Sequence, residues 1–504
     1  MTLEFDDAGF AYPAREGDGF AAPVVEHLSF CVEPGEVVLL CGASGCGKST
    51  ALKMANGLVP HHERGCLYGE VRLGGVSLGS MPMHEIAGRV ASVFQNPKTQ
   101  MFNAEVRSEL AFTGENLGRD PREVREAVMR AAADFGVEGL LGRRAFELSG
   151  GEAQRVCCAA AEAAGAEVLV LDEPSSNLDV WSIDALRRYV AQWKREGKAV
   201  LVAEHRVYYL RDFVDKVLLV QDGGVARSWT GEEFRALSVG ETDALGLRCV
   251  RPEECAAGDI VLSGPARPGV ARVVGLTCDY GSGCEKRRAL AVGELELPLG
   301  VPIAVVGRNG AGKSTLVRSL AGIAKDVAGT LELPGSGSLD ATARRARSAL
   351  VMQDVTRQLF CSGVLDEVCL GDACTREEAA DVLRDLDLID FADVHPLTLS
   401  GGQRQRLCVA SAIAAGRDVV LFDEPTSGLD LAHMRQVAGL VREVAAAGRL
   451  VLVVSHDYEF ICACCGHVLE LGAGRVAGSW SLDDTAGASR LRDFFWSDLE
   501  GDVL

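Results

Sequence analysis

The 504-residue chain carries the same series of motifs twice, and this duplication constrains its fold more than any other feature. The segment GASGCGKST at 42–50 returns as GRNGAGKST at 307–315, and ELSGGEAQR returns as TLSGGQRQR. Later pairs are all 251 residues apart: Ser149 and Ser400, Glu173 and Glu424, and His205 and His456. A repeat of this length is a whole domain of about 230 residues and not a short solenoid unit.

We therefore predict two copies of one domain, at residues 1–237 and 271–482. Between them, residues 238–270 are rich in Pro and Gly and show no clear periodicity, which predicts a linker. Residues 483–504 form a short tail whose aromatic side chains are candidates for docking on the body of the protein.

Short apolar runs lead into the motifs and read as buried strands. They lie at 36–41, 168–171 and 198–203, and again at 301–306, 419–422 and 450–454. Strands that alternate with helical patterns predict a mostly parallel sheet with ligands at the carboxyl ends of the strands. Residues 100–147 and 358–398 carry helical patterns, which predict a helical subdomain in each copy.

Each glycine-rich loop matches G-x-x-x-x-G-K-S, the Walker A motif. Glycine lets the backbone approach a phosphate, so that N–H groups and the helix N-terminus face its oxygens. We expect Lys48 and Lys313 to neutralise phosphate charge, and Ser49 and Ser314 to offer a hydroxyl to Mg²⁺. The predicted phosphate-binding residues are Gly42, Ala43, Ser44, Gly45, Cys46, Gly47, Lys48, Ser49 and Thr50, and Gly307, Arg308, Asn309, Gly310, Ala311, Gly312, Lys313, Ser314 and Thr315.

An Asp-Glu pair ends one buried strand in each copy, Asp172–Glu173 and Asp423–Glu424. The first carboxylate suits a Mg²⁺ ligand, as a Walker B residue, and the second suits a general base that polarises an attacking water. The LSGG segments place small residues at a helix start, which is another anion-binding arrangement.

The order Walker A, Q-loop glutamine, LSGGQ signature, Walker B, D-loop and switch histidine, present twice, resembles that of tandem ATP-binding cassette (ABC) ATPases. The resemblance covers nearly the whole chain outside the linker and tail. It implies an α/β fold of two P-loop ABC ATPase cassettes. Each would have a mainly parallel β-core, a helical subdomain and an antiparallel β part.

The resemblance also implies ATP and Mg²⁺ as cofactors and two cassettes that pair head-to-tail within the chain, each ATP lying between one Walker A loop and the other signature. One site would use Lys48, Ser49, Gln95, Asp172, Glu173 and His205 with Ser400, Gly401 and Gly402. The other would use Lys313, Ser314, Gln353, Asp423, Glu424 and His456 with Ser149, Gly150 and Gly151. The catalytic residues would be Gln95, Glu173, His205, Gln353, Glu424 and His456. The Mg²⁺ contacts would be Ser49, Gln95, Asp172, Ser314, Gln353 and Asp423. Tyr12 and Tyr280 match the adenine-stacking aromatic residue, and Asp179 and Asp430 match the D-loop aspartates.

The Q-loop segments QNPKTQMF and QDVTRQLF resemble the Q-x-x-x-x-Q-[LM]-F pattern of energy-coupling factor (ECF) transporter ATPases. This likeness implies an ATPase that powers uptake of a vitamin or a transition-metal ion. Its partners would be a transmembrane subunit and a substrate-binding membrane component. We expect a cytoplasmic protein, peripheral on the inner face of the membrane, that contacts the membrane through these protein partners.

Two alternatives remain open. A tandem ATPase of a sugar importer has a similar length, but it usually has a degenerate second Walker A loop, and GRNGAGKST is intact here. A soluble ABC factor that acts on the ribosome would need a basic surface for RNA, whereas this chain has a net charge of −20, which argues against nucleic acid as a partner.

The first signature departs from the family pattern because Glu152 replaces its usual glutamine, while Gln403 keeps it in the second. In a head-to-tail pair, Glu152 would face the nucleotide held by the second Walker A loop. We expect this negative charge to weaken closure there modestly.

Overall fold

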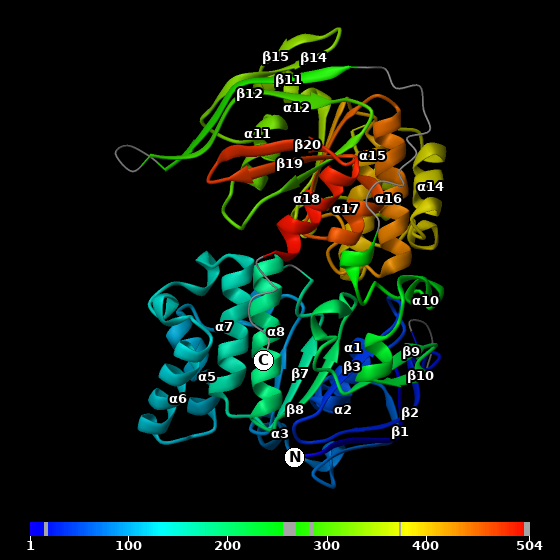
Figure 1. Cartoon of the computed structure of the whole chain (residues 1–504). Coiled ribbons are helices and arrows are strands. Elements are labelled where there is room, and N and C mark those ends of the chain that lie inside the picture. The colour runs from blue at the N-terminus through cyan, green and yellow to red at the C-terminus, as the bar shows by residue number, and fades with distance from the viewer. Residues whose placement is uncertain (15–18, 177, 256–268, 282–285, 372–373, 498–504) are drawn as a thin grey trace. The chain divides into compact units, whose positions relative to one another are not determined.

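The computed structural model describes residues 1–14, 19–176, 178–255, 269–281, 286–371 and 374–497. It contains two compact units, Met1–Arg251 and Pro252–Leu504, which we treat one at a time. The predicted α/β architecture is present in both (Figure 1). In the described residues, no helix combines the length and the apolar character needed to cross a membrane.

A six-stranded sheet forms the centre of unit 1, in the order β10-β9-β3-β8-β7-β6. All neighbours along it run parallel except β10, which pairs antiparallel with β9. The strands are β3 (Val37–Cys41), β6 (Val90–Val93), β7 (Val168–Asp172), β8 (Ala199–Ala203), β9 (Lys216–Gln221) and β10 (Gly224–Thr230).

Strand β3 is buried on both faces, as its unbroken apolar sequence predicts. Because side chains alternate along a strand, Val37 and Leu39 enter the core on one face, while Val38 and Leu40 enter the core on the other. The glycine-rich loop therefore begins at the end of a strand that is held from both sides.

A second, antiparallel sheet of order β2-β1-β4-β5 covers one face of the central sheet. Helix α1 (Lys48–Ala55) lies in the core between them and contributes Ala51, Leu52 and Ala55 to it. The strands are β1 (Leu3–Ala11), β2 (Val25–Val32), β4 (Cys66–Leu73) and β5 (Val76–Ser77). Short helices α2 (Leu58–His61), α3 (Met83–Ala87) and α4 (Pro97–Gln100) join these parts.

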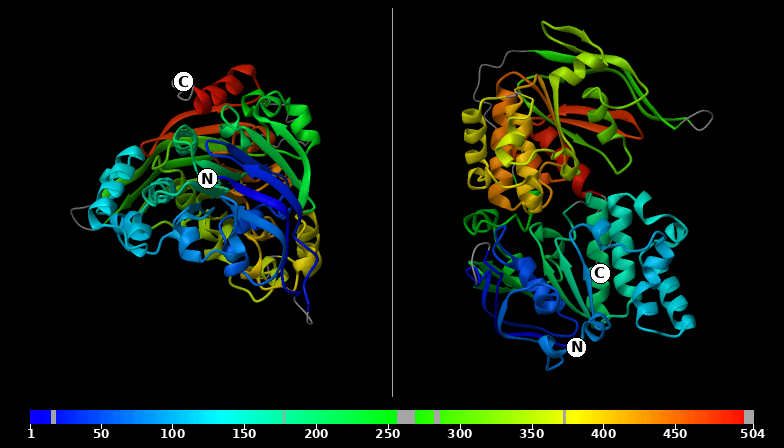
Figure 2. Two further views of the ribbon diagram at one scale, coloured as in Figure 1. Left: turned by 90° about the horizontal axis from the view of Figure 1, so that it is seen from below. Right: turned by 180° about the vertical axis from the view of Figure 1, so that it is seen from behind.

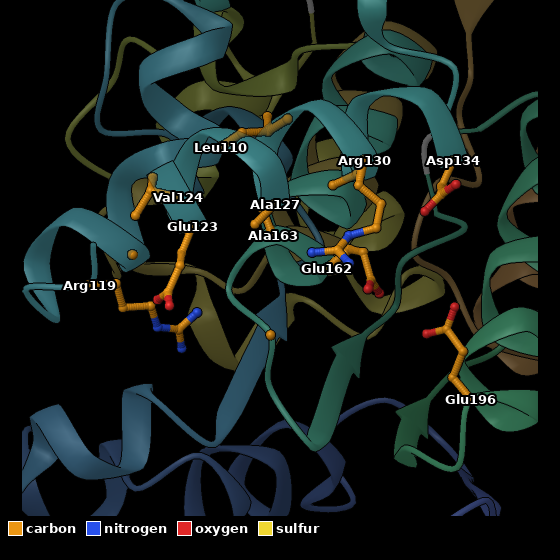
Figure 3. Close-up of a pocket in the computed structure, with 13 residues that line it drawn as sticks. Leu110, Arg119, Glu123, Val124, Ala127, Arg130, Asp134, Glu162, Ala163 and Glu196 are labelled. Atoms are coloured by element: carbon orange, nitrogen blue, oxygen red, sulfur yellow. The ribbon is translucent and has the colours of Figure 1, made fainter. Parts of the chain in front are cut away.

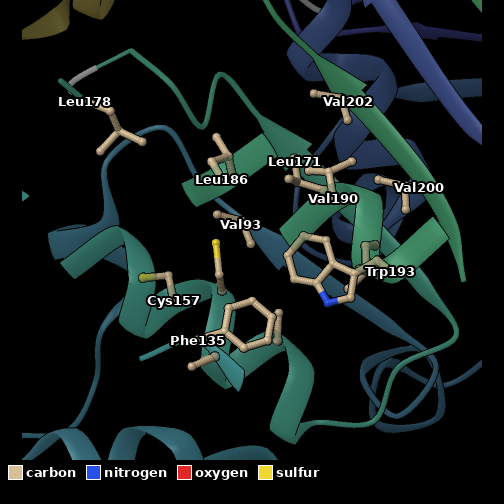
Figure 4. Packing of buried hydrophobic residues seen from close by; sticks show 14 of the residues in the cluster. Val93, Phe135, Cys157, Leu171, Leu178, Leu186, Val190, Trp193, Val200 and Val202 are labelled. Atoms are coloured by element: carbon tan, nitrogen blue, oxygen red, sulfur yellow. The ribbon is translucent and has the colours of Figure 1, made fainter. Parts of the chain in front are cut away.

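Helices cover the other face, and those within residues 100–147 build the predicted helical subdomain, which Figures 1 and 2 show to one side of the central sheet. Trp193 is fully buried there, against Phe135, which also contacts Tyr189 (Figure 4). The indole N–H of Trp193 donates a hydrogen bond of 2.8 Å to Glu162. The helices are α5 (Val106–Asn116), α6 (Pro121–Asp134), α7 (Gly150–Ala163), α8 (Val180–Arg195), α9 (Gly231–Arg235) and α10 (Val239–Ala244).

Unit 2 repeats this plan with sheets of order β16-β17-β18-β13-β19-β20 and β12-β11-β14-β15. Its strands are β11 (Val270–Tyr280), β12 (Arg287–Pro298), β13 (Pro302–Val306), β14 (Val327–Leu333), β15 (Gly337–Leu339), β16 (Ser348–Val351), β17 (Val419–Asp423), β18 (Leu450–Val454), β19 (His467–Gly472) and β20 (Arg475–Ser481). Its helices are α11 (Lys313–Leu320), α12 (Ala341–Arg347), α13 (Val364–Val368), α14 (Arg376–Asp385), α15 (Gly401–Ala414), α16 (Leu431–Ala446), α17 (Tyr458–Cys464) and α18 (Thr485–Trp496).

The segment predicted as a linker begins with helix α10, and Leu247 and Val250 after it are buried in the core of unit 1. Its residues 256–268 lie outside the described part of the chain. The predicted tail contains helix α18, whose Leu491 and Phe495 are buried. Phe495 meets the ring of Tyr458 edge-on, with centroids 5.4 Å apart, so the tail packs on unit 2 directly after the switch histidine.

Candidate functional site

The two glycine-rich loops have nearly the same backbone. Gly42 and Gly307 have φ values of 143° and 149°, which side-chain-bearing residues rarely adopt. A Cβ on Gly42 would lie 2.2 Å from the carbonyl oxygen of Val220, and one on Gly307 would lie 2.3 Å from that of Leu471. Each loop therefore needs glycine where it leaves its strand.

Each loop delivers its lysine to the first turn of a helix. Gly47 and Gly312 are the N-caps of α1 and α11 and bring no side-chain cap, so the first N–H groups of these helices are left for an anion. The Lys48 ammonium donates to the carbonyl oxygens of Gly42 and Ala43 at 2.9 and 2.8 Å. Lys313 makes the matching contacts in unit 2.

The Walker A serine and the Walker B aspartate, both predicted Mg²⁺ ligands, lie together in unit 1, where the Ser49 hydroxyl donates to Asp172 at 3.0 Å. Burial, and then the charge of Glu173, raises the pKa of Asp172 to about 6. Burial also raises the pKa of Asp423, against a hydrogen bond from Ser314. A hydroxyl beside a desolvated carboxylate is a suitable oxygen pair for Mg²⁺.

Three predicted residues converge at Glu173. The Gln95 side-chain amide donates to Oε2 of Glu173 at 2.7 Å, and Nε2 of His205 lies 3.3 Å from Oε1. Glu173 has a φ of 43°, a strained conformation for this residue type, and its N–H donates to Ala203 on the neighbouring strand. The strain turns the carboxylate out of the sheet toward the glutamine and the histidine.

The same place in unit 2 is built alike, but its carboxylate and histidine lie farther apart. Glu424 has a φ of 56°, and its Oε1 lies 3.8 Å from Nε2 of His456. Gln353 is exposed, and its side chain has no hydrogen-bond partner among the residues that the structure describes. The structure thus brings Gln95 to its carboxylate and leaves Gln353 apart.

The two tyrosines occupy equivalent places beside the Walker A loops. The Tyr12 hydroxyl is 3.3 Å from Oγ1 of Thr50, and the Tyr280 hydroxyl is 3.4 Å from Oγ1 of Thr315. Tyr280 is 46% exposed, so its ring is open to a flat ligand. The D-loop aspartates Asp179 and Asp430 cap helices α8 and α16.

The LSGG motifs start helices α7 and α15, where Ser149 and Ser400 are the N-caps. Glu152 accepts from the N–H and hydroxyl of Ser149, and its other oxygen pairs with Arg143 at 2.9 Å. Burial acts to raise the pKa of Glu152, but these hydrogen bonds and the Arg143 charge outweigh it and lower the pKa. Arg143 therefore pairs with the Glu152 charge inside this signature, and the effect of that charge on closure stays a prediction.

The comparisons identify the family. The model of the ABC transporter ATP-binding domain matches residues 25–176 and 292–427, which is more than half of the chain. The chain belongs to this ABC transporter family. A protein of Treponema denticola named as an ABC transporter ATP-binding protein is 37% identical over 450 residues, which cover 89% of this chain and 92% of that protein. A second Treponema denticola protein of the same name is 34% identical over 485 residues (95% and 97%), and one of Methanosarcina acetivorans is 30% identical over 511 residues (90% and 82%).

Solved structures share the fold of these two ABC cassettes. An archaeal ribosome recycling factor, in complex with the ribosomal stalk protein aP1, matches with a TM-score of 0.61 at 22% identity, covering 96% of this chain and 92% of that one. ABCE1 in a ribosome-bound complex with archaeal Pelota matches with a TM-score of 0.67 at 24% identity, covering 97% and 80%. The predicted fold class is confirmed, and the chain is an ATP-hydrolysing enzyme of a family that generally uses ATP with Mg²⁺.

Sequence reasoning gave no role to the second glutamine of each Q-loop. Gln100 accepts from the N–H of Phe94 and donates to the carbonyl of Ser92, so it closes the Q-loop of cassette 1 onto strand β6. In cassette 2, Gln358 accepts from Met352 and donates to Leu350 in the same way. The Q-x-x-x-x-Q spacing is therefore a structural brace.

A second brace follows each Q-loop. Glu109 accepts from the backbone N–H groups of Phe102 and Asn103, and Glu367 accepts from those of Phe360 and Cys361. Phe102 and Phe360 are nevertheless 76% and 75% exposed. Each cassette thus holds a fixed backbone and presents a phenylalanine to solvent.

A separate hollow of about 490 Å³ lies in the helical subdomain of cassette 1 (Figure 3). Figure 3 shows Arg119 and Glu123 on one side and Arg130 with Glu162 on the other. Residues of α5, α6 and the end of α7 line it together with Glu196, and no predicted site residue is among them. The candidate site is therefore the Walker A region of each cassette.

Proposed function

We propose that this chain is the ATP-binding and ATP-hydrolysing subunit of an ECF-type ABC importer, which powers uptake of a vitamin or a transition-metal ion through separate membrane subunits. The relatives named as ABC transporter ATP-binding proteins support this reading, since the best-covered of those described above matches over nearly its full length. The sequence pattern Q-x-x-x-x-Q-[LM]-F supports the ECF type, because it occurs in both cassettes.

In each cassette, the Walker A loop would bind the phosphates through its N–H groups and its lysine. Ser49 with Asp172, and Ser314 with Asp423, would hold Mg²⁺, which neutralises phosphate charge when bound. Glu173 and Glu424 would accept the proton of the attacking water, with His205 and His456 beside them. Gln95 would couple the conformation of the Q-loop to that of the Glu173 carboxylate through its 2.7 Å hydrogen bond.

The signatures complete the sites in this proposal. Ser149, Gly150 and Gly151 of cassette 1 would close on the ATP of cassette 2, and Ser400, Gly401 and Gly402 would close on that of cassette 1. Each segment is the N-terminus of a 14-residue helix, which favours a negatively charged ligand. ATP binding would draw the cassettes together, and hydrolysis would release them.

The single observation that carries the transport role is the exposed phenylalanine held beside each Q-loop. In cassette 1, Phe102 stacks on Phe112 with centroids 5.5 Å apart. In cassette 2, Phe360 borders a hollow of about 380 Å³ that Leu370, 52% exposed, also lines. Aromatic side chains on a fixed backbone are typical anchors of protein interfaces.

Because the Q-loop glutamine and this phenylalanine belong to one braced segment, a partner seated on Phe102 would sense the contact between Gln95 and Glu173. Occurrence of the anchor in both cassettes fits a membrane partner with two docking elements. The partner would be a transmembrane subunit, together with a substrate-binding membrane component.

The test is purification of the tagged chain from detergent-solubilised membranes of a cell that makes the whole transporter. We expect a stoichiometric polytopic membrane subunit, which stimulates ATPase activity in reconstituted vesicles. The double variant Phe102→Ser with Phe360→Ser should lose this subunit and the stimulation. Phe20→Ser, at a phenylalanine that is 57% exposed on another part of cassette 1, is the matched control and should keep both.

The ribosome-associated alternative has a specific observation in its favour, which is the shared fold of the two solved structures described above. Sedimentation of the purified chain with ribosomes distinguishes this alternative from the importer proposal. We expect it to stay in the supernatant at physiological salt. Stoichiometric binding to ribosomes without a membrane subunit would replace the importer proposal.

A further inference from the structure

The segments around the two switch histidines differ in sequence in a way that the family motifs do not describe. Cassette 1 reads Glu204-His205-Arg206, and cassette 2 reads Ser455-His456-Asp457. Each segment contributes a buried carboxylate, but from opposite sides of the histidine.

In cassette 1 this carboxylate is Glu204, which is 1% exposed. It accepts hydrogen bonds from the backbone N–H of Ser175 at 3.2 Å and from the N–H of His205 at 2.8 Å. The N–H of Arg206 and the hydroxyl of Tyr209, both at 3.2 Å, complete the set. All four partners are donors, so the hydrogen bonds fit the ionised carboxylate.

These hydrogen bonds connect the segment that follows Glu173 to the segment that contains His205. Ser175 lies two residues after Glu173, and His205 is the residue next to Glu204. Burial and the Glu173 charge raise the pKa of Glu204, and the hydrogen bonds from Ser175, His205 and Arg206 oppose that rise.

In cassette 2 the same link is made with different residues. Thr426, at the place of Ser175, donates its hydroxyl to Asp457 at 3.2 Å, and the N–H of Asp457 donates to Ser455. The other oxygen of Asp457 accepts from the N–H of Phe460, which takes the place of Tyr209 and has no hydroxyl.

A further detail supports the equivalence. Ser175 is fully buried and, like its counterpart Thr426, carries a hydroxyl. In cassette 2 the hydroxyl at this position donates to Asp457, which is the counterpart of residue 206. Cassette 1 thus has a hydroxyl at the same position but makes the link with Glu204, on the other side of the histidine.

We propose that Glu204 is a positioning residue of cassette 1, which fixes His205 relative to Glu173, and that Asp457 performs this role in cassette 2. The inference rests on the proposed roles of Glu173 and His205 and adds a residue that holds them. In this inference both carboxylates act through the histidine and not on the nucleotide itself.

The test transplants one arrangement into the other cassette of the full chain. Glu204→Ser removes the link, and Glu204→Ser with Arg206→Asp and Tyr209→Phe installs that of cassette 2. Because misplacing a catalytic group by about 1 Å can cost about 10²-fold at its own site, Glu204→Ser should lower kcat to about half or less while KM for ATP is unchanged. The triple variant should recover kcat to near the wild-type value.

Glu162→Ser removes another shielded carboxylate, the partner of Trp193, and is the matched control. It should lower thermal stability but leave kcat unchanged. Unaltered kcat in Glu204→Ser, or a triple variant as slow as Glu204→Ser, would overturn the inference. Glu173→Gln and His205→Ala are measured in parallel. If these two variants also have normal kcat, the proposed roles of Glu173 and His205 are wrong. If they lose activity while Glu204→Ser keeps a normal kcat, only the inference about Glu204 is wrong.

Discussion

Arg143 lies 2.9 Å from Glu152, so the one acidic residue in the first signature is neutralised within its own cassette. The equivalent residues of cassette 2 are Val394 and Gln403, which carry no charge. The two halves thus differ at both positions together, as expected of residues that compensate one another.

Arg143→Val should weaken ATP-driven closure at the site that this signature is proposed to complete, because Glu152 would then face the triphosphate unpaired. A partly exposed pair of this kind contributes about 0.2–1 kcal/mol, so we expect the apparent KM for ATP to rise about 1.5–5-fold. Adding Glu152→Gln, which copies cassette 2, should restore it. Steady-state kinetics provide the measurement and Arg144→Val the control. Equal KM values in Arg143→Val and Arg144→Val would show that the pair has no effect.

Glu173→Gln and Glu424→Gln should each slow hydrolysis at their own site by about 10²–10⁴-fold, because they remove the proposed general base without changing side-chain size. ATP binding should persist, since the Walker A loops are unaltered. Phosphate release and nucleotide affinity are measured for each variant, with exposed Glu126→Gln as the control. A near-normal rate of phosphate release in one variant would show that the mutated cassette does not contribute to hydrolysis.

Asp172 makes the nucleotide-free protein pH-sensitive. Its pKa, about 6, is above the ordinary value of 3.8, so the folded state holds the proton more tightly than the unfolded state. Stability is therefore lost as pH rises from about 4 to about 6, and Asp172→Asn should be the more stable chain by roughly 1–3 kcal/mol above pH 6. This gain should shrink as pH falls below about 6.

Thermal unfolding across this pH range, without nucleotide or Mg²⁺, is the measurement for Asp172. The exposed carboxylate of Asp134 supplies the control variant, Asp134→Asn. A stability difference between Asp172→Asn and wild type that stays constant with pH would contradict the burial argument.

Helix α18 should stabilise the segment after the switch histidine. Leu491 is fully buried, and Leu491→Ala should cost about 2–5 kcal/mol in the stability of cassette 2. Hydrogen exchange should rise in α18 and in α17, which Tyr458 begins, while strands of cassette 1 serve as an internal reference. Exposed Asp493→Ala should change neither helix. Unchanged hydrogen-exchange protection of α17 in Leu491→Ala would show that the tail does not stabilise this helix.

Much of the fold follows from local pattern. The apolar run at 168–171 became β7, and the helical pattern from Pro121 became α6, which Asp120 caps as the sequence order suggests. Burial of a strand on both faces and the capping of a helix both depend on residues that are close together in the sequence. The sequence alone can therefore predict them.

The braces and links were not predictable in this way. Gln100, Arg143 and Glu204 each act through a partner on another turn, helix or strand, and single-residue properties do not reveal such partners. The signal for two of them was present, because aligning the halves of the chain shows Arg143 against Val394 and Glu204 against Ser455.

The carboxylate that changes sides at the switch histidine also limits how the two halves of this gene can exchange DNA. A gene conversion with its breakpoint within codons 204–206 would create Glu-His-Asp, with two acidic residues, or Ser-His-Arg, with none. If Glu204 and Asp457 have the proposed positioning role, only an exchange of all three codons together preserves the link. Sequence divergence between the halves is therefore expected to persist here even if the surrounding motifs are homogenised.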